Sequence, residues 1–137
     1  MGTQERLNNY LISQSNISFA WGVNDCLTFT NNAWKAMYGH GWADDWLGRY
    51  MTNGKPMCRS QLVKEFGKYS FEEAVDERLQ PAGKYPPRGA LVTTTHARRW
   101  VTGVALGICN GTRGVFLNDQ GLIYLPLDLI KNSWIKI

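Results

Sequence analysis

The most constraining feature of this sequence is a change in character near Pro81, where helical patterns give way to short β-type segments. The run Pro86-Pro87-Arg88-Gly89 then excludes a continuing helix, because proline lacks a backbone donor and glycine weakens helices. Helices first and adjacent strands second are typical of an α+β domain. We therefore expect N-terminal helices, in about residues 1–80, packed on a C-terminal antiparallel β-sheet, in about residues 88–137.

The length of 137 residues suits one domain and is too short for two of ordinary size. Aromatic residues are spread from Tyr10 to Trp134, so no part of the chain reads as a linker. The sequence predicts a single domain over residues 1–137.

Periodicity and turn residues predict the individual elements. Helices are expected at residues 3–14, 26–38, 42–50, 60–66, 70–79 and 126–131, and strands at 90–95, 101–109, 114–118, 122–125 and 134–137. Thr3 is the expected N-cap of the first helix, and Asn24 or Asp25 of the second. Residues 118–121 predict a hairpin turn.

Cys26 stands at the start of the second helical pattern, which Gly39 closes. The first turn of a helix offers a thiol unpaired N–H groups and the positive end of the helix dipole, both of which favour the thiolate. Cys26 also shares a stripe with Thr30, Ala33 and Met37, which places it on the interior side. A nucleophile and a buried structural cysteine are both consistent with this pattern.

The other two cysteines, Cys58 and Cys109, are expected to be small buried hydrophobes. Three cysteines cannot all pair within one chain, and their spacing does not suit a metal site, so we expect a reduced compartment and no metal or cofactor. The N-terminus is polar and no stretch approaches the roughly 18 apolar residues of a membrane span. Synthesis in a cytoplasm and no membrane span are therefore predicted.

Three further features of the sequence each have two interpretations. The net charge of +4, which includes the pair Arg98-Arg99, indicates either a solvated basic face or a nucleic-acid site, and we expect the solvated face. His40 with Asp44 and Asp45 could be metal ligands, but adjacent aspartates more often cap or solvate a short helix. The aromatic residues Trp42, Trp46 and Tyr50 mark either an exposed partner surface or buried helix packing.

The order of motifs resembles the papain-like cell-wall cysteine peptidases of the NlpC type. It is more similar still to a phage-encoded branch of that superfamily, small proteins found among tail genes, and the resemblance covers most of the chain except the middle helices. The matching pieces are Trp21-Gly22 and Asp25-Cys26, Pro87-Arg88-Gly89-Ala90-Leu91-Val92, Ala105-Leu106-Gly107-Ile108-Cys109-Asn110-Gly111, Gly121-Leu122-Ile123-Tyr124-Leu125-Pro126-Leu127, and Trp134-Ile135. The resemblance implies a papain-like fold.

The chain departs from the peptidase pattern at two positions. Ala105 occupies the place of the catalytic histidine at the start of the second strand, and Ala90 that of an aspartate usual in the first. A helix rise of 1.5 Å per residue puts His40 on the order of 20 Å from the Cys26 thiol, which nearly excludes it as a base. His96 follows the first strand, and it either substitutes from there as the base or points to solvent. Asn118 is the candidate to orient that imidazole.

An active site would use His96 to deprotonate Cys26, which attacks a peptide carbonyl while N–H groups at the helix start hold the oxyanion. The resemblance then implies a murein stem peptide as substrate. We expect instead a virion protein of the phage tail tip or hub, with a degenerate peptidase domain acting in tail structure or assembly. Its expected partners are other tail proteins and, if the domain is active, peptidoglycan. The alternatives are an active endopeptidase that acts during genome entry and a free-standing bacterial amidase or toxin.

Overall fold

The computed structural model describes residues 2–98 and 100–137. Its α-helices are α1 (Thr3–Ser13), α2 (Cys26–Tyr38), α3 (Arg59–Phe66) and α4 (Phe71–Asp76), and its 3-10 helices are η1 (Asp44–Trp46) and η2 (Leu127–Leu129). Its strands are β1 (Met51–Thr52), β2 (Lys55–Pro56), β3 (Gln80–Pro81), β4 (Leu91–Thr94), β5 (Ala105–Cys109), β6 (Arg113–Asn118), β7 (Gly121–Pro126) and β8 (Ile130–Ile135).

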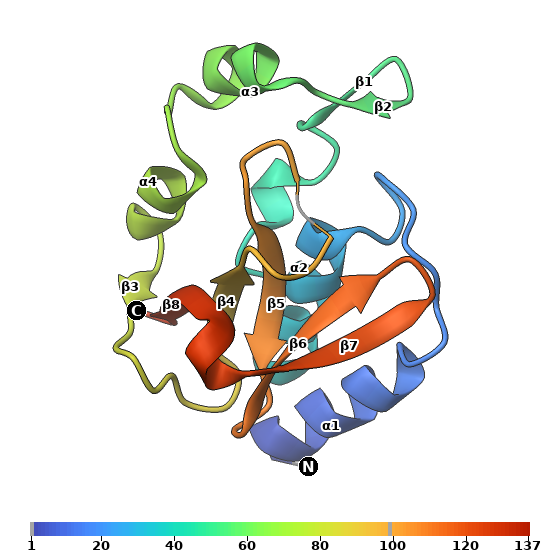
Figure 1. The fold of residues 1–137 in the computed structure, drawn as a ribbon, viewed down its shortest axis with the longest axis vertical. Helices are drawn as coiled ribbons and strands as arrows, with labels where there is room; N and C mark the ends of the chain where they lie inside the picture. Colours follow the sequence, from blue (N-terminus) through green and yellow to red (C-terminus); the bar gives the residue numbers. More distant parts are fainter. Residues whose placement is uncertain (1, 99) are drawn as a thin grey trace.

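The main sheet has six strands in the order β3-β8-β4-β5-β6-β7, and each neighbouring pair is antiparallel. Figure 1 shows α2 behind this sheet, where it packs on β5, with α1 packed against α2. Helix α3 lies at the top of the view next to β1 and β2, and α4 lies at the left, above β3 (Figure 1). The chain is therefore α+β, with N-terminal helices and a C-terminal antiparallel sheet, and the predicted class is confirmed.

Helix α2 forms where the sequence predicts it because both of its ends are capped. The side chain of Asp25 accepts a hydrogen bond from the Thr28 N–H at 2.9 Å, and the Thr28 hydroxyl accepts one from the Asp25 N–H at 2.8 Å. Gly39 ends the helix in the left-handed region at φ 85°, which glycine adopts without a Cβ penalty. The capped helix presents Cys26 and Phe29 to the core.

The glycine in the Ala-Leu-Gly-Ile strand has a packing role on the outer face of the sheet. Gly107 on β5 lies opposite Phe116 on β6. A Cβ at Gly107 would come 2.6 Å from the Phe116 ring and 2.4 Å from the Val115 carbonyl oxygen. The glycine thus makes room for Phe116, which is fully buried in a second apolar cluster on this face.

The middle segment differs most from its prediction. Only η1 forms where a helix was expected at 42–50, and the helix expected at 70–79 ends at Asp76. Trp42, Trp46 and Tyr50 are buried in the main core, so their packing interpretation is correct and an exposed aromatic surface is excluded.

Two further expectations are wrong. Thr3 is the first residue of α1, and its N-cap is Gly2, which makes no side-chain cap. The short helix expected at 126–131 is only η2, because the chain from Ile130 onward pairs with β4 and forms β8. None of the helices within the described residues is both long and apolar enough to cross a membrane.

Candidate functional site

A buried carboxylate organises the start of α2. The Asp25 side chain is inaccessible to solvent. Besides the Thr28 N–H it accepts hydrogen bonds from the Gly22 N–H at 2.8 Å and from the Tyr50 hydroxyl at 2.5 Å. Three donors on one buried anion compensate the loss of its hydration. Asp25 therefore ties together the preceding loop, helix α2 and the middle segment.

The loop before α2 explains the rest of the Trp-Gly-x-x-Asp-Cys motif. Ala20 and Asn24 close a tight turn with two backbone hydrogen bonds. Gly22 takes φ 78° within it, a conformation that favours glycine. Trp21 packs on Trp100, with ring centroids 6.0 Å apart. Each of these residues has a structural role at this position.

Cys26, the first residue of α2, is sealed inside the protein. Only 2% of its surface is exposed. The Leu106 backbone on β5, the strand that begins at Ala105, lies near enough to its sulfur to act on the pKa of the thiol, which it lowers. The sulfhydryl therefore lies against the sheet, near the start of β5.

The environment of Cys26 opposes ionisation. Burial is the first cause and the adjacent Asp25 charge the second, and together they raise the pKa of its thiol to about 12. The backbone N–H groups at the helix start act the other way, but desolvation is the largest cause. Near neutral pH this cysteine is a thiol rather than a nucleophilic thiolate.

His96 lies on the loop that follows β4, with an exposed side chain. The end of β4 lies beside the start of β5, because Thr94 pairs with Ala105. Thr94 is buried, and its hydroxyl donates to the Leu129 carbonyl and accepts from the His96 N–H at 3.1 Å. Among the described residues, no hydrogen bond joins the His96 ring to Cys26.

Asn118 ends β6 and pairs with Gly121 across the predicted hairpin. The neighbouring Asp119 forms an ion pair with Arg98, so the loop carrying His96 and the hairpin carrying Asn118 are held next to each other. Within the described part of the chain, the side chain of Asn118 has no hydrogen bond to His96. The structure thus brings the two loops together without forming a Cys-His-Asn chain of hydrogen bonds. Arg99, of the predicted basic pair, lies outside the described residues.

The other two cysteines differ from each other. Cys109 is buried, as expected, with the Gly111 N–H 3.3 Å from its sulfur. Cys58 is exposed, and the expectation that it fills buried space is wrong, because it precedes α3 as its N-cap residue. Its sulfur lies 3.2 Å from the Ser60 hydroxyl, and this hydrogen bond is the first cause that lowers the pKa of Cys58.

Local structure explains the acidic pair Asp44 and Asp45, for which metal binding and capping were the two interpretations. Asp44 accepts hydrogen bonds from the Asn31 side chain at 2.8 Å and from the Gly41 N–H at 2.9 Å, and these lower its pKa. Asp45 forms an ion pair with Arg78 at 2.7 Å. No cluster of metal-ligating side chains occurs in residues 2–98 and 100–137.

The sequence did not reveal that Tyr50 is a hydrogen-bond partner of Asp25. Nor did it reveal that the Trp100 ring packs against the Tyr50 ring. The Tyr50 and Trp100 ring centroids are 5.4 Å apart. Burial and the Asp25 carboxylate both raise the pKa of Tyr50, so its hydroxyl stays protonated as a donor. Only the three-dimensional packing brings these distant residues to the start of α2, so no spacing in the sequence could have revealed them.

Residues 2–135 match a protein family described as Domain of unknown function (DUF6950). No curated protein matches the chain.

Proposed function

The chain belongs to the DUF6950 family, and we propose that it is a virion protein of a phage tail, with a papain-like domain that has lost peptidase chemistry. In this proposal the domain acts in the structure or assembly of the tail tip or hub, beside other tail proteins. It is synthesised in the host cytoplasm and ends in the particle.

The proposed loss of peptidase activity rests on one observation, the burial of Cys26 and the raised pKa of its thiol. A nucleophilic cysteine needs a thiolate within reach of substrate and a base within hydrogen-bond distance. The Cys26 thiol is 2% exposed, its pKa is raised to about 12, and the neighbouring strand begins with Ala105. Cys26 therefore behaves as a core residue that joins α2 to the sheet.

The papain-like assignment is supported by the order of elements. A capped helix begins at Cys26 and packs on β5, and antiparallel strands follow it in the chain. The tail assignment is supported by the resemblance in the Trp-Gly-x-x-Asp-Cys motif, the Ala-Leu-Gly-Ile strand and the ending of the chain. Fold alone decides no activity, so both assignments require direct tests.

Murein digestion tests the chemistry. Purified wild-type protein and the Cys26→Ala and His96→Ala variants are incubated with murein sacculi, and released peptides are measured by mass spectrometry. We expect no release above buffer from any of the three. His96 is exposed, so His96→Ala should fold normally and controls for damage to the core. Release by the wild type that both variants lose would establish the active endopeptidase and overturn the proposal.

Particle composition tests the location. Tails are purified from the phage or prophage whose genome encodes the chain, and the protein is quantified by mass spectrometry against a known tail protein. We expect a fixed stoichiometry in the particles. We also expect a phage carrying Cys26→Ala to assemble infectious particles as the wild type does. Absence of the protein from purified particles would overturn the tail assignment.

A further inference from the structure

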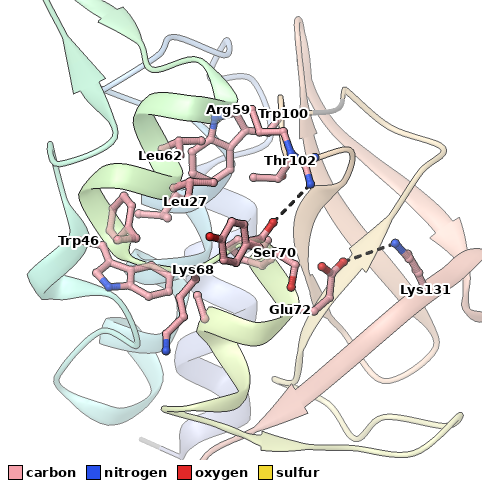
Figure 2. A pocket seen from close by; sticks show the side chains of 15 residues that line it. Leu27, Trp46, Arg59, Leu62, Lys68, Ser70, Glu72, Trp100, Thr102 and Lys131 are labelled. Atoms are coloured by element: carbon pink, nitrogen blue, oxygen red, sulfur yellow. Dashed lines mark hydrogen bonds and ion pairs between the residues drawn. The ribbon is translucent and has the colours of Figure 1, made fainter.

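A pocket of about 250 Å³ lies between the start of α2, helices α3 and α4, and the loop around Trp100. Figure 2 shows Leu27 and Trp46 on one side of it and the ion pair of Glu72 with Lys131 on the other. Most of its lining is apolar, including Leu62 and the rings of aromatic residues. Concave apolar surface with a few polar groups is the usual form of a small-molecule site.

The charges around this pocket do not balance. Its lining contains three cations, Arg59, Lys68 and Lys131, and one carboxylate, Glu72. Lys131 is 3.5 Å from Glu72, and Lys68 pairs with Glu77. The Arg59 guanidinium donates only to the Tyr69 carbonyl, at 3.3 Å, and forms no ion pair within the described residues. A positive charge without a counterion at an apolar pocket favours an anionic ligand.

Two lining residues also carry polar atoms that lack partners. The Trp100 indole N–H and the Thr102 hydroxyl are buried and, within the described residues, form no hydrogen bond. Only 7% of the Trp100 surface is exposed. An unsatisfied buried donor of this kind destabilises the fold, because it has lost its hydrogen bonds to water. Both residues line the pocket, so a ligand there would contact side chains that carry unsatisfied polar atoms.

We propose that this pocket binds a small carboxylate with an aromatic or branched apolar body, with the body against the apolar walls and the carboxylate toward Arg59. The volume of about 250 Å³ suits one such group rather than a large cofactor. Binding involves no chemistry at Cys26, so this inference stands apart from the proposed tail function. The same chemistry is offered by a free acid and by a polypeptide that ends in an apolar residue.

The test uses N-acetylphenylalanine and its neutral amide as matched probes. Each is titrated into the ¹⁵N-labelled full chain while the six indole N–H resonances are followed by NMR, with Trp100 assigned by Trp100→Phe. We expect the Trp100 resonance to move with the acid at a Kd of about 0.1–1 mM, as ligand efficiency suggests for about 15 heavy atoms. The amide should bind at least about five-fold more weakly, because it lacks the charge.

Variants locate the site. Arg59→Gln should reduce affinity for the acid to that for the amide and leave the amide unchanged. Arg88→Gln is the matched control, since that guanidinium also donates to a backbone carbonyl, of Asn110, but does not line the pocket. Val63→Trp should fill the pocket and abolish binding of both probes. Val63 is only partly buried, so the chain should tolerate this change, and Ala74→Leu provides a second, smaller filling.

The outcomes separate the parts of the inference. Equal affinity for acid and amide, unaltered by Arg59→Gln, would overturn the carboxylate assignment. A Trp100 resonance that does not move, or that moves equally in both pocket-filling variants, would overturn the site. A pentapeptide ending in phenylalanine distinguishes the sources: tighter binding than the free acid assigns the ligand to a polypeptide C-terminus, and weaker binding assigns it to a free acid.

Discussion

Cys26 and Cys58 both stand at the N-terminal end of a helix, yet their thiols are opposite in character. Cys26 begins α2, is buried, and has a pKa raised to about 12. Cys58 precedes α3, is exposed, and has a lowered pKa because of the Ser60 hydroxyl and backbone N–H groups. The helix dipole has the same sign at both sites, so it cannot explain the difference.

The comparison shows that hydration decides the state of these thiols. Cys58 keeps its contact with water and adds hydrogen bonds, which favour the thiolate. Cys26 also has backbone donors, but it loses water and lies next to the Asp25 charge. A cysteine at the start of a helix therefore indicates a nucleophile only when the site is also open to solvent.

The largest expected difference is in thiol labelling. With a pKa of about 12, only about 1 in 10⁴ of Cys26 is thiolate near pH 8. A pulse of iodoacetamide should therefore modify Cys58 at least about 10³-fold faster than Cys26, as measured by peptide mass spectrometry. Cys58→Ser should remove the fast reaction, and concentrated guanidinium should expose all three cysteines. Equal labelling rates at Cys26 and Cys58 in the folded protein would contradict the burial of the Cys26 thiol.

The second-largest expected effect is on stability and comes from the buried Asp25 carboxylate, which precedes α2. Asp25→Asn keeps an acceptor for the Thr28 N–H but turns an amide NH₂ toward the donors on Gly22 and Tyr50. We expect a loss of about 2–4 kcal/mol in the free energy of unfolding, measured in urea. Tyr50→Phe, which leaves the carboxylate two donors, should cost about 1–2 kcal/mol.

Asp119→Asn is the matched control for this prediction, since Asp119 is exposed and, within the described residues, is paired only with Arg98. Its expected cost is below about 0.5 kcal/mol, as for other surface ion pairs. An Asp25→Asn effect as small as that would mean that the carboxylate does not hold the start of α2 together.

The stability of the folded chain at alkaline pH should also depend on Cys26 and not on Cys58. The pKa of Cys26 is raised from 9.0 to about 12, so between these values the folded chain retains a proton that the unfolded chain has lost. Its stabilising contribution is complete below about pH 9 and is lost as pH rises toward 12, at up to about 1.4 kcal/mol per pH unit. Cys26→Ala should show a correspondingly shallower decline in urea unfolding, whereas Cys58→Ser should not. Identical slopes in the wild type and Cys26→Ala would be inconsistent with burial of a neutral thiol.

Much of the fold could be predicted because its signals are local. The periodicity of α2 and its cap, the turn at 118–121 and the strands from β4 to β7 can all be read from neighbouring residues. The middle segment could not, because tertiary contacts decide it. Asn31 on α2 binds both Asp44 and the Ala43 N–H, which fixes the chain around η1. Pairing with β4 likewise turns the residues after η2 into β8.

The candidate site could be predicted only in part. The periodicity of α2 correctly predicted that Cys26 faces the interior, but one of the groups that act on the pKa of its thiol is the Leu106 backbone, which is 80 residues away in the chain. The position of Cys58 as an N-cap was missed because cysteine is an uncommon residue there. Arg59 carried no signal, because the absence of a counterion for it among the described residues is a property of the folded surface.

The smallest expected effect concerns the hydrogen bond that sets Cys58 apart. Ser60→Ala removes the first cause of its lowered pKa, so the pKa should rise toward its ordinary value. Labelling near neutral pH should then slow by less than about tenfold, while the urea midpoint stays unchanged because the side chains are exposed. At a pH above both pKa values the two proteins should react at the same rate, since each thiol is fully ionised. A difference that persists there would assign the effect to access of the reagent rather than to ionisation, and the Ser60 hydroxyl would no longer explain the contrast with Cys26.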